Sequence, residues 1–402
     1  MVNSAVEAVV QAPKSGQRAD AEDLSSLCCP NPACPKFEHF GGDNLRVAER
    51  MGKDKCLRRL ACRVCQTRFS ELRGSLLEYT QISEGKVVQI VKCLTYGNSV
   101  EATADKSGGG LQNCATDRYR VADGAPNSFT TRTSVNWKPN RSRWTRSMLK
   151  KGVKRGGKRR TKAAWIFTAV AVCSRLLLDI SVGNRDAQHA DSFVARVAAR
   201  LKSLPLFSVD NWKAYYGAFL RIAHRVVQRR RRSRSQRGRR PLPVLAPRAD
   251  LKVAVVNKVR NAAGRVVKVT RFALYGKLKE IKRIIKNSGQ RVINTSFIER
   301  LHATLRSQTA RLFRRTRART VLVEMPRNPL HLWRDVYNWV RVHRGLQGRT
   351  PAMAAGLTDH VWSLREYVRV PIHPDPLYEA ELQATVNALL NCPLDPRKRA
   401  AA

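Results

Sequence analysis

Hydrophobic and polar positions change their period along the chain. Residues 84–94 carry apolar side chains at helical spacing, Gly97 predicts the end of that helix, and residues 99–104 predict a second one. Two short helices joined by a glycine turn suit a helix-turn-helix, whose third element would read the major groove of DNA. Because three glycines occupy residues 108–110, where a third helix should begin, a plain helical hairpin fits the pattern nearly as well.

Further along, strand-like and helical segments alternate. Residues 165–172 and 176–182 are rich in β-branched and aromatic side chains and predict a hairpin. Asp186 is placed to cap the helix that follows, and residues 204–209 predict a short strand ending at Asp210. Together with the N-terminal segments, these elements predict an α+β multidomain chain.

Between these regions the pattern is lost. Residues 124–164 follow neither a helical nor a strand period, and the chain carries no acid between Asp123 and Asp179. This predicts a basic, irregular linker that follows the DNA backbone. A segment whose coding frame has been altered would show the same abrupt loss of pattern. Residues 228–240 include an arginine block that cannot be buried, which predicts a solvated insertion with nonspecific phosphate contacts.

The net charge of +46 over 402 residues identifies the class of partner. A field of this sign attracts polyanions, so DNA or RNA is the expected partner and a membrane surface the weaker alternative. No apolar run reaches the ~18 residues of a membrane-spanning helix, and residues 1–27 lack the features of a signal peptide. We therefore expect a cytoplasmic, nucleoid-associated protein of two or three domains without a membrane partner.

Six of the ten cysteines lie between Cys28 and Cys65, which indicates a metal site. Two pairs of cysteines have the spacing of zinc knuckles, and a segment between them predicts a connecting β-hairpin. The expected ligands of a structural Zn²⁺ are Cys29, Cys34, Cys62 and Cys65. Cys28 and Cys56 are surplus. Because this region has few apolar residues, the metal would have to supply its folding energy.

One acid in an otherwise cationic helix points to phosphodiester chemistry. Glu299 is followed by Arg300, Arg306 and further arginines, and it shares a helix face with His302. Bound Mg²⁺ needs oxygen ligands, whereas a phosphodiester needs cations, so this mixture suits a metal site beside DNA. The plainer alternatives are a surface ion pair for Glu299 and a cap or turn for Asp210.

The order of these motifs resembles insertion-sequence transposases that combine a zinc ribbon, a helix-turn-helix and a DDE catalytic domain of RNase H-like fold. The most specific segments are residues 293–300 and 350–359 with 362–364, joined by 182–186 and 209–212. The resemblance implies the following boundaries: an N-terminal tail (1–24), the zinc ribbon (25–80), the helix-turn-helix (81–121), the linker (122–164), the RNase H-like domain (165–370) with its arginine-rich insertion (228–250), and a C-terminal tail (371–402).

The resemblance also implies site residues. Asp210 corresponds to the second and Glu299 to the third acid of the catalytic triad, which would bind Mg²⁺, and Arg300, His302 and Arg306 are expected DNA contacts. The first acid, which the family carries on its first strand, has no counterpart around residues 141–144, and Asp179 is a poor substitute by position.

Two hypotheses follow from this incomplete set. The leading one is a transposase that binds terminal inverted repeats in double-stranded DNA, acts as a homo-oligomer on DNA, and carries out Mg²⁺-dependent strand cleavage and transfer. The alternative is a zinc-dependent DNA-binding protein without catalysis. An RNA-binding zinc-ribbon protein is weaker, because Asp210 and Glu299 would then have no role.

Overall fold

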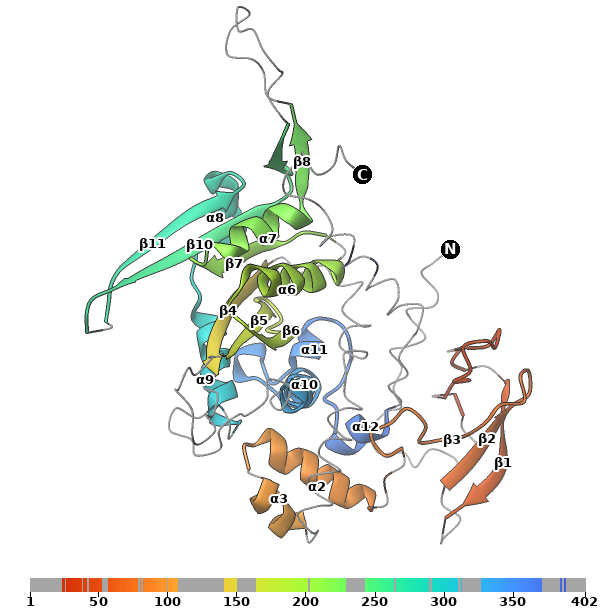
Figure 1. The fold of residues 1–402 in the computed structure, drawn as a ribbon. Coiled ribbons are helices and arrows are strands. Elements are labelled where there is room, and N and C mark those ends of the chain that lie inside the picture. Colours follow the sequence, from red (N-terminus) through yellow and green to blue (C-terminus); the bar gives the residue numbers. More distant parts are fainter. Residues whose placement is uncertain are drawn as a thin grey trace, which may run out of the picture. The chain divides into compact units, whose positions relative to one another are not determined.

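The computed structural model describes most of residues 24–107, 141–149, 164–228, 243–309 and 327–370, with short gaps inside them (Figure 1). The described part of the chain is a mixed α/β protein that divides into two compact units. The first unit combines residues 1–129 with residues 339–376, and the second combines residues 130–338 with residues 377–402. The expected tails, the third element of the helix-turn-helix and the arginine block at 229–242 lie outside the described residues.

The first unit begins with a small antiparallel sheet. Strand β1 (Leu45–Met51) pairs with β2 (Leu57–Cys62), which pairs with β3 (Arg68–Ser70). Its few buried apolar side chains, Leu45, Leu60 and Phe69, pack against cysteines rather than against a second layer. The expected hairpin between the two cysteine pairs is therefore confirmed.

Two helices follow in the first unit, α2 (Glu84–Thr95) and α3 (Val100–Ser107). Gly97 between them has a φ of +89°, a conformation that glycine adopts without a steric penalty, which accounts for the break. The helices contact each other through Ile90 and Ala104. The predicted helix pair is confirmed, whereas its assignment as a helix-turn-helix stays a prediction because residues 108–140 are not described.

The C-terminal part of the first unit returns to α2. It contains a 3-10 turn, η3 (Arg344–Leu346), and two short helices, α11 (Pro351–Ala354) and α12 (Leu364–Arg369). Arg369 of α12 forms an ion pair with Glu84 of α2 at 2.6 Å, and Arg341 donates to the carbonyl of Thr95 at 2.8 Å. Residues 339–376 are grouped with the N-terminal segments, and the expected domain boundaries stay a prediction.

The second unit is built on a six-stranded sheet with the order β11-β10-β7-β4-β5-β6. Strands β4, β7 and β10 are parallel to one another. Strand β5 pairs antiparallel with β4, β6 pairs antiparallel with β5, and β11 pairs antiparallel with β10. The six strands are β4 (Arg141–Leu149), β5 (Ala164–Ala171), β6 (Leu177–Gly183), β7 (Leu206–Asp210), β10 (Lys252–Arg260) and β11 (Val266–Tyr275). The predicted hairpin at 165–182 and the strand ending at Asp210 are confirmed.

Helices cover both faces of this sheet. On one face lie α6 (Ala187–Ala199) and α7 (Ala214–Ile222), which contact it through Phe193 against Phe167 and Phe219 against Phe207. As predicted, Asp186 caps α6 and accepts a hydrogen bond from the backbone of His189 at 2.8 Å. On the other face lie α8 (Leu278–Asn287), α9 (Ser296–Ser307) and α10 (Arg327–Asp335), the last followed by the π-helical segment η2 (Val336–Val340).

Two parts of the second unit differ from the sequence-based expectation. Strand β4 lies inside residues 122–164, for which we expected an irregular linker. It pairs with β5 on one side and β7 on the other, so its conformation comes from neighbours distant in sequence rather than from its own pattern. The expected arginine-rich insertion at 228–250 also contains an ordered strand, β9 (Val244–Pro247), which pairs with β8 (His224–Val227).

Candidate metal centre and acidic site

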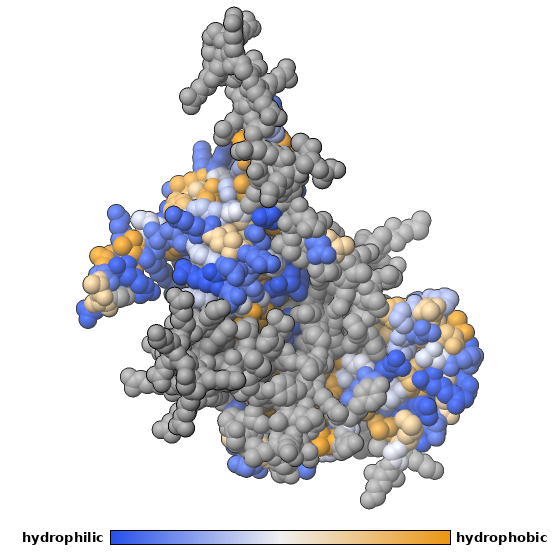
Figure 2. All heavy atoms as spheres, viewed as in Figure 1, coloured by the Kyte–Doolittle hydropathy of each residue, from blue (hydrophilic) through white to orange (hydrophobic). Residues whose placement is uncertain are grey.

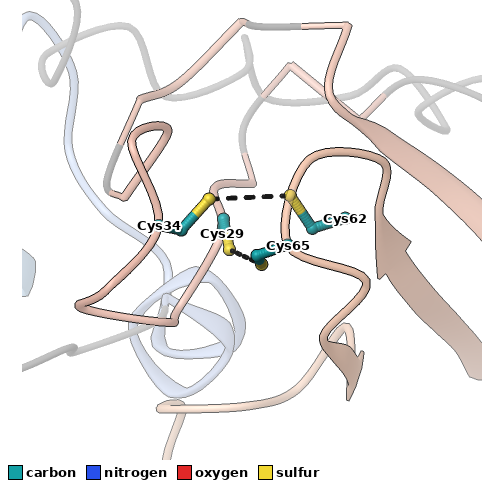
Figure 3. Close-up of side chains that lie close together, drawn as sticks. All are labelled: Cys29, Cys34, Cys62 and Cys65. Carbon is teal, nitrogen blue, oxygen red and sulfur yellow. Dashed lines mark hydrogen bonds between the residues drawn. The ribbon is translucent and has the colours of Figure 1, made fainter.

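Four cysteine side chains of the first unit converge on one point (Figure 3). Their sulfur atoms all lie within 4.8 Å of one another, with Cys29 Sγ 3.5 Å from Cys65 Sγ and Cys34 Sγ 3.9 Å from Cys62 Sγ. A tetrahedron with Zn–S bonds of ~2.3 Å has sulfur–sulfur edges of about 3.8 Å. These four cysteines, which are the predicted set, could therefore hold a tetrahedral Zn²⁺ with little movement.

A tight turn and nearby N–H donors position these thiols and stabilise their ionised form. The loop after β2 is a tight turn, in which the backbone N–H of Gln66 donates to the carbonyl of Cys62 at 2.9 Å, and this holds Cys65 close to Cys62. The backbone N–H of Lys36 donates to Cys34 Sγ at 3.4 Å, and the Asn44 amide donates to Cys62 Sγ at 3.5 Å. Such donors stabilise thiolates, the form in which cysteine binds metal.

The pKa values of the cysteines are spread by their surroundings. A hydrogen bond with the Thr67 hydroxyl, 3.2 Å away, is the main cause that lowers the pKa of Cys65 to about 6. Burial raises the pKa of Cys29. Four thiolates cannot coexist in this buried space without a compensating charge, and a divalent cation supplies it.

Cys28 lies outside the group of four although it is buried next to Cys29. The preference for Cys29 over Cys28 as a ligand is thus consistent with the geometry. Cys56 falls outside the described residues.

In the second unit, Asp210 and Glu299 lie on the same side of the sheet. Leu206 packs against Ile281 of α8, and because side chains alternate along a strand, Asp210 faces the same side as Leu206. Asp210 pairs with Val256 of the parallel strand β10, and Lys258, two residues further on, shares that face. Lys258 Nζ forms an ion pair with Glu299 Oε1. One strand pairing and one ion pair thus connect the two predicted acids.

The carboxylate of Glu299 is held from two directions. The Thr295 hydroxyl donates to Glu299 Oε1 at 2.7 Å, and Lys258 donates to the same oxygen. Partial burial raises the pKa of Glu299, but these hydrogen bonds and the charge of Lys258 outweigh it and hold the pKa below its usual range. Glu299 is therefore ionised and half-exposed, and its carboxylate is paired with the ammonium group of Lys258.

His302 does not suit the expected role as a DNA contact. Its side chain is only 5 % exposed, and Nε2 lies 2.7 Å from the Thr168 hydroxyl of β5. Burial lowers its pKa to about 4, so the ring is neutral at physiological pH. We correct the expectation: His302 belongs to the face of α9 that packs on the sheet, whereas Arg300 is exposed and Arg306 partly exposed.

Asp179 cannot take the place of the first acid. It pairs with Ala169 across β5 and β6, on the sheet face that also carries Phe167 and α6, and it forms ion pairs with Arg196 and Arg200 at 3.2 Å each. That face is opposite to the one with Asp210 and Glu299. Although burial raises the pKa of Asp179, the charges of the two arginines hold it below its usual range. Asp179 thus has a structural role.

The position next to Asp210 on β4 carries no acid. The register pairs Trp144 with Val209, so residue 145 follows beside Asp210, and it is a threonine; none of the nine residues of β4 is Asp or Glu. Among the described residues, the four cysteines are the only group of three or more metal-ligating side chains close enough to share an ion. On this face of the sheet, the described residues thus offer the two predicted acids, Asp210 and Glu299, and no acid from β4.

The sequence carried no signal for Lys258, which is one cation among 76, or for Thr295 as partners of Glu299. Lys258 lies 41 residues before Glu299, and the two meet because α9 lies on the sheet face that carries Lys258.

The sequence matches no protein-family profile and no curated protein. Among solved structures, the chain is similar to piggyBac transposase in a cryo-EM synaptic complex with hairpin DNA. The identity is 10 % and the TM-score 0.31, over 82 % of this chain and 77 % of that one. A TM-score of this size assigns neither fold nor function. Among the described residues, no helix is long and apolar enough to cross a membrane.

Proposed function

We propose that this chain is a zinc-dependent DNA transposase, which binds element ends and uses Asp210 and Glu299 to hold Mg²⁺ for DNA strand cleavage and transfer. The observation that carries the proposal is the common sheet face of the two carboxylates, at the end of β7 and above β10. The carboxyl ends of parallel strands are where open α/β sheets place catalytic groups. The order of β6, β5, β4, β7 and β10 supports an RNase H-like domain.

The roles of the residues follow from their chemistry. Asp210 and Glu299 would hold the cation, which would polarise the scissile phosphate and lower the pKa of the attacking hydroxyl. Arg300 and Arg306, on the same helix as Glu299, would contact phosphates of the DNA backbone. The four-cysteine site would keep the N-terminal ribbon folded for DNA binding. Assembly as a homo-oligomer on DNA stays a prediction.

A second candidate function is DNA binding without catalysis. Two observations favour it: strand β4 carries no acid beside Asp210, and the carboxylate of Glu299 already forms an ion pair with Lys258. A shared carboxylate usually bridges the two metal ions of such sites, and its loss weakens the binding of both.

A strand-transfer assay separates the two. The full chain, DNA fragments carrying the ends of the element that encodes it, and Mg²⁺ or Mn²⁺ are mixed, and joined products are measured beside DNA binding. Under the first proposal, Glu299→Gln and Asp210→Asn abolish joining but keep binding, whereas Glu280→Gln on α8 keeps both. Tight, salt-sensitive binding with no product from the unmodified chain supports the second candidate. If the chain fails to bind duplex DNA, both are refuted.

A further inference from the structure

The hairpin of β10 and β11 extends beyond the sheet that supports it (Figure 1). The pairing of β10 with β7 ends at Val256, whereas β10 and β11 stay paired to each other as far as Arg260 and Val266. At ~3.3 Å per residue, the four residues after Val256 carry β10 about 13 Å past the end of that pairing. We call residues 257–270 the β10–β11 arm.

The charge of the arm has one sign. Residues 257–270 contain four lysines and arginines and no Asp or Glu. Three of these cations, Arg260, Arg265 and Lys268, are exposed near the tip. The root of the arm is tied to the acidic site, because Lys258 binds Glu299 and the nearby Arg271 donates to the carbonyl of Ile293 at 2.7 Å.

Apolar side chains are exposed among these cations. Val259 is 45 %, Val266 44 % and Val267 68 % exposed, and they lie beside the three tip cations. Figure 2 shows hydrophilic and hydrophobic residues side by side on this projecting part of the surface. An isolated two-stranded ribbon is at best marginally stable in water, and exposed apolar residues rimmed by cations are typical of an interaction surface.

We infer that the β10–β11 arm binds duplex DNA by entering the major groove. This deepens the proposed function and depends on it. A major groove ~12 Å wide and ~8.5 Å deep admits a two-stranded β-ribbon, and the arm is longer than the groove is deep. The tip cations then contact phosphates on either side of the groove, while the valines meet base edges and thymine methyl groups. Because its root contacts Glu299, the arm orients the duplex relative to the acidic site.

A salt titration of DNA binding tests the inference. The full chain is titrated by fluorescence anisotropy with a 30-base-pair duplex DNA of mixed sequence, the same sequence as duplex RNA, and one of its DNA strands alone. In the triple variant Arg260→Ala/Arg265→Ala/Lys268→Ala, each lost phosphate contact lowers the slope of log K against log salt by about 0.9, so we expect a decrease of about 2 to 3.

The matched control removes three exposed lysines from α8, Lys279→Ala/Lys282→Ala/Lys286→Ala, and changes the net charge equally. We expect this control to lose less than half as much slope. Equal losses in both triple variants would overturn the role of the arm. A-form RNA has a deep, narrow major groove that the arm cannot enter, so equal losses on duplex RNA or on the single strand would overturn groove insertion. If the unmodified chain binds duplex DNA and the arm variant is unchanged, only this inference fails; if it binds no duplex, the proposed function fails.

Discussion

Replacing one cysteine of the four-sulfur group should unfold the N-terminal ribbon while leaving the second unit intact. The substitution Cys62→Ser removes a thiolate at a fully buried position, and a serine hydroxyl is a poor ligand for Zn²⁺ at neutral pH. The size of the effect follows from what else holds the region together. In the cluster around the cysteines, three large apolar side chains are buried, and at ~1.5–3 kcal/mol each they contribute roughly 5–9 kcal/mol before chain entropy is counted.

A structural zinc ion contributes about 10–16 kcal/mol in small zinc-binding domains, more than the apolar contacts of this region. Without it, the three-stranded sheet cannot offset the entropy of ordering its residues. We therefore expect the unmodified chain to contain one zinc per molecule and Cys62→Ser to contain almost none. In the variant, protease sites should open within residues 24–80 but not within the sheet of the second unit.

The assay measures bound metal by mass spectrometry and adds a spectroscopic readout, the thiolate-to-Co²⁺ absorption of the cobalt-substituted protein. Cys28→Ser is the matched control, because Cys28 is also buried and adjacent in sequence but lies outside the group of four. One zinc per chain in Cys62→Ser, or equal metal loss in both variants, would refute the assignment.

Two further predictions concern buried charges of the second unit. Burial lowers the pKa of His302 to about 4, below the ~6.5 of an exposed histidine, so the unfolded chain takes up this proton before the folded chain as pH falls. The free energy of unfolding should therefore decrease by about 3 kcal/mol between pH 6.5 and 4. Urea unfolding at several pH values measures this slope, and His302→Gln should flatten it. Asp179→Asn leaves the buried Arg200 without its ion-pair partner and should cost about 3–5 kcal/mol at pH 7, whereas Asp250→Asn, which breaks an exposed pair, should cost less than about 1 kcal/mol. Because the pKa of Asp179 is held below its usual value, the contribution of Asp179 to stability should be lost only as pH falls below about 4. Equal losses of stability in Asp179→Asn and Asp250→Asn would contradict the structural role of Asp179.

Local signals were enough to predict the zinc ligands and the first hairpin of the sheet. The four cysteines stand in two short turns whose spacing fixes their geometry, and the hairpin at 165–182 is carried by β-branched residues around a three-residue connection. The cap at Asp186 is likewise a contact between residues three apart. In the hairpin, the cap and each cysteine pair, the interacting residues lie close together in sequence, where periodicity and turn chemistry are informative. The two cysteine pairs are 28 or more residues apart, and the prediction joined them because one tetrahedral Zn²⁺ needs four ligands.

The contacts that could not be predicted join distant segments. Strand β4 has no alternating pattern, and its conformation depends on hydrogen bonds to β5 and β7. His302 looked like a surface residue because it shares a helix face with Glu299, but the sheet covers that part of α9 and Thr168 supplies its partner 134 residues away. Helical period shows which residues share a face, but not how far the neighbouring sheet extends over it.

The charge balance around Glu299 limits the number of divalent cations that the proposed site could hold. Two dications held by three carboxylates would leave one net positive charge at the site. The proposed site has two carboxylates, and Lys258 pairs with one of them, so two dications would leave three positive charges, whereas a single dication would again leave one. If the proposed site binds Mg²⁺, this charge balance favours one cation over two, and a phosphate of bound DNA would neutralise the remaining charge. Lys258 balances the negative charge of Glu299 when no DNA is bound. Because Lys258 lies at the root of the β10–β11 arm, a phosphate of bound DNA would compete with Glu299 for its ammonium group.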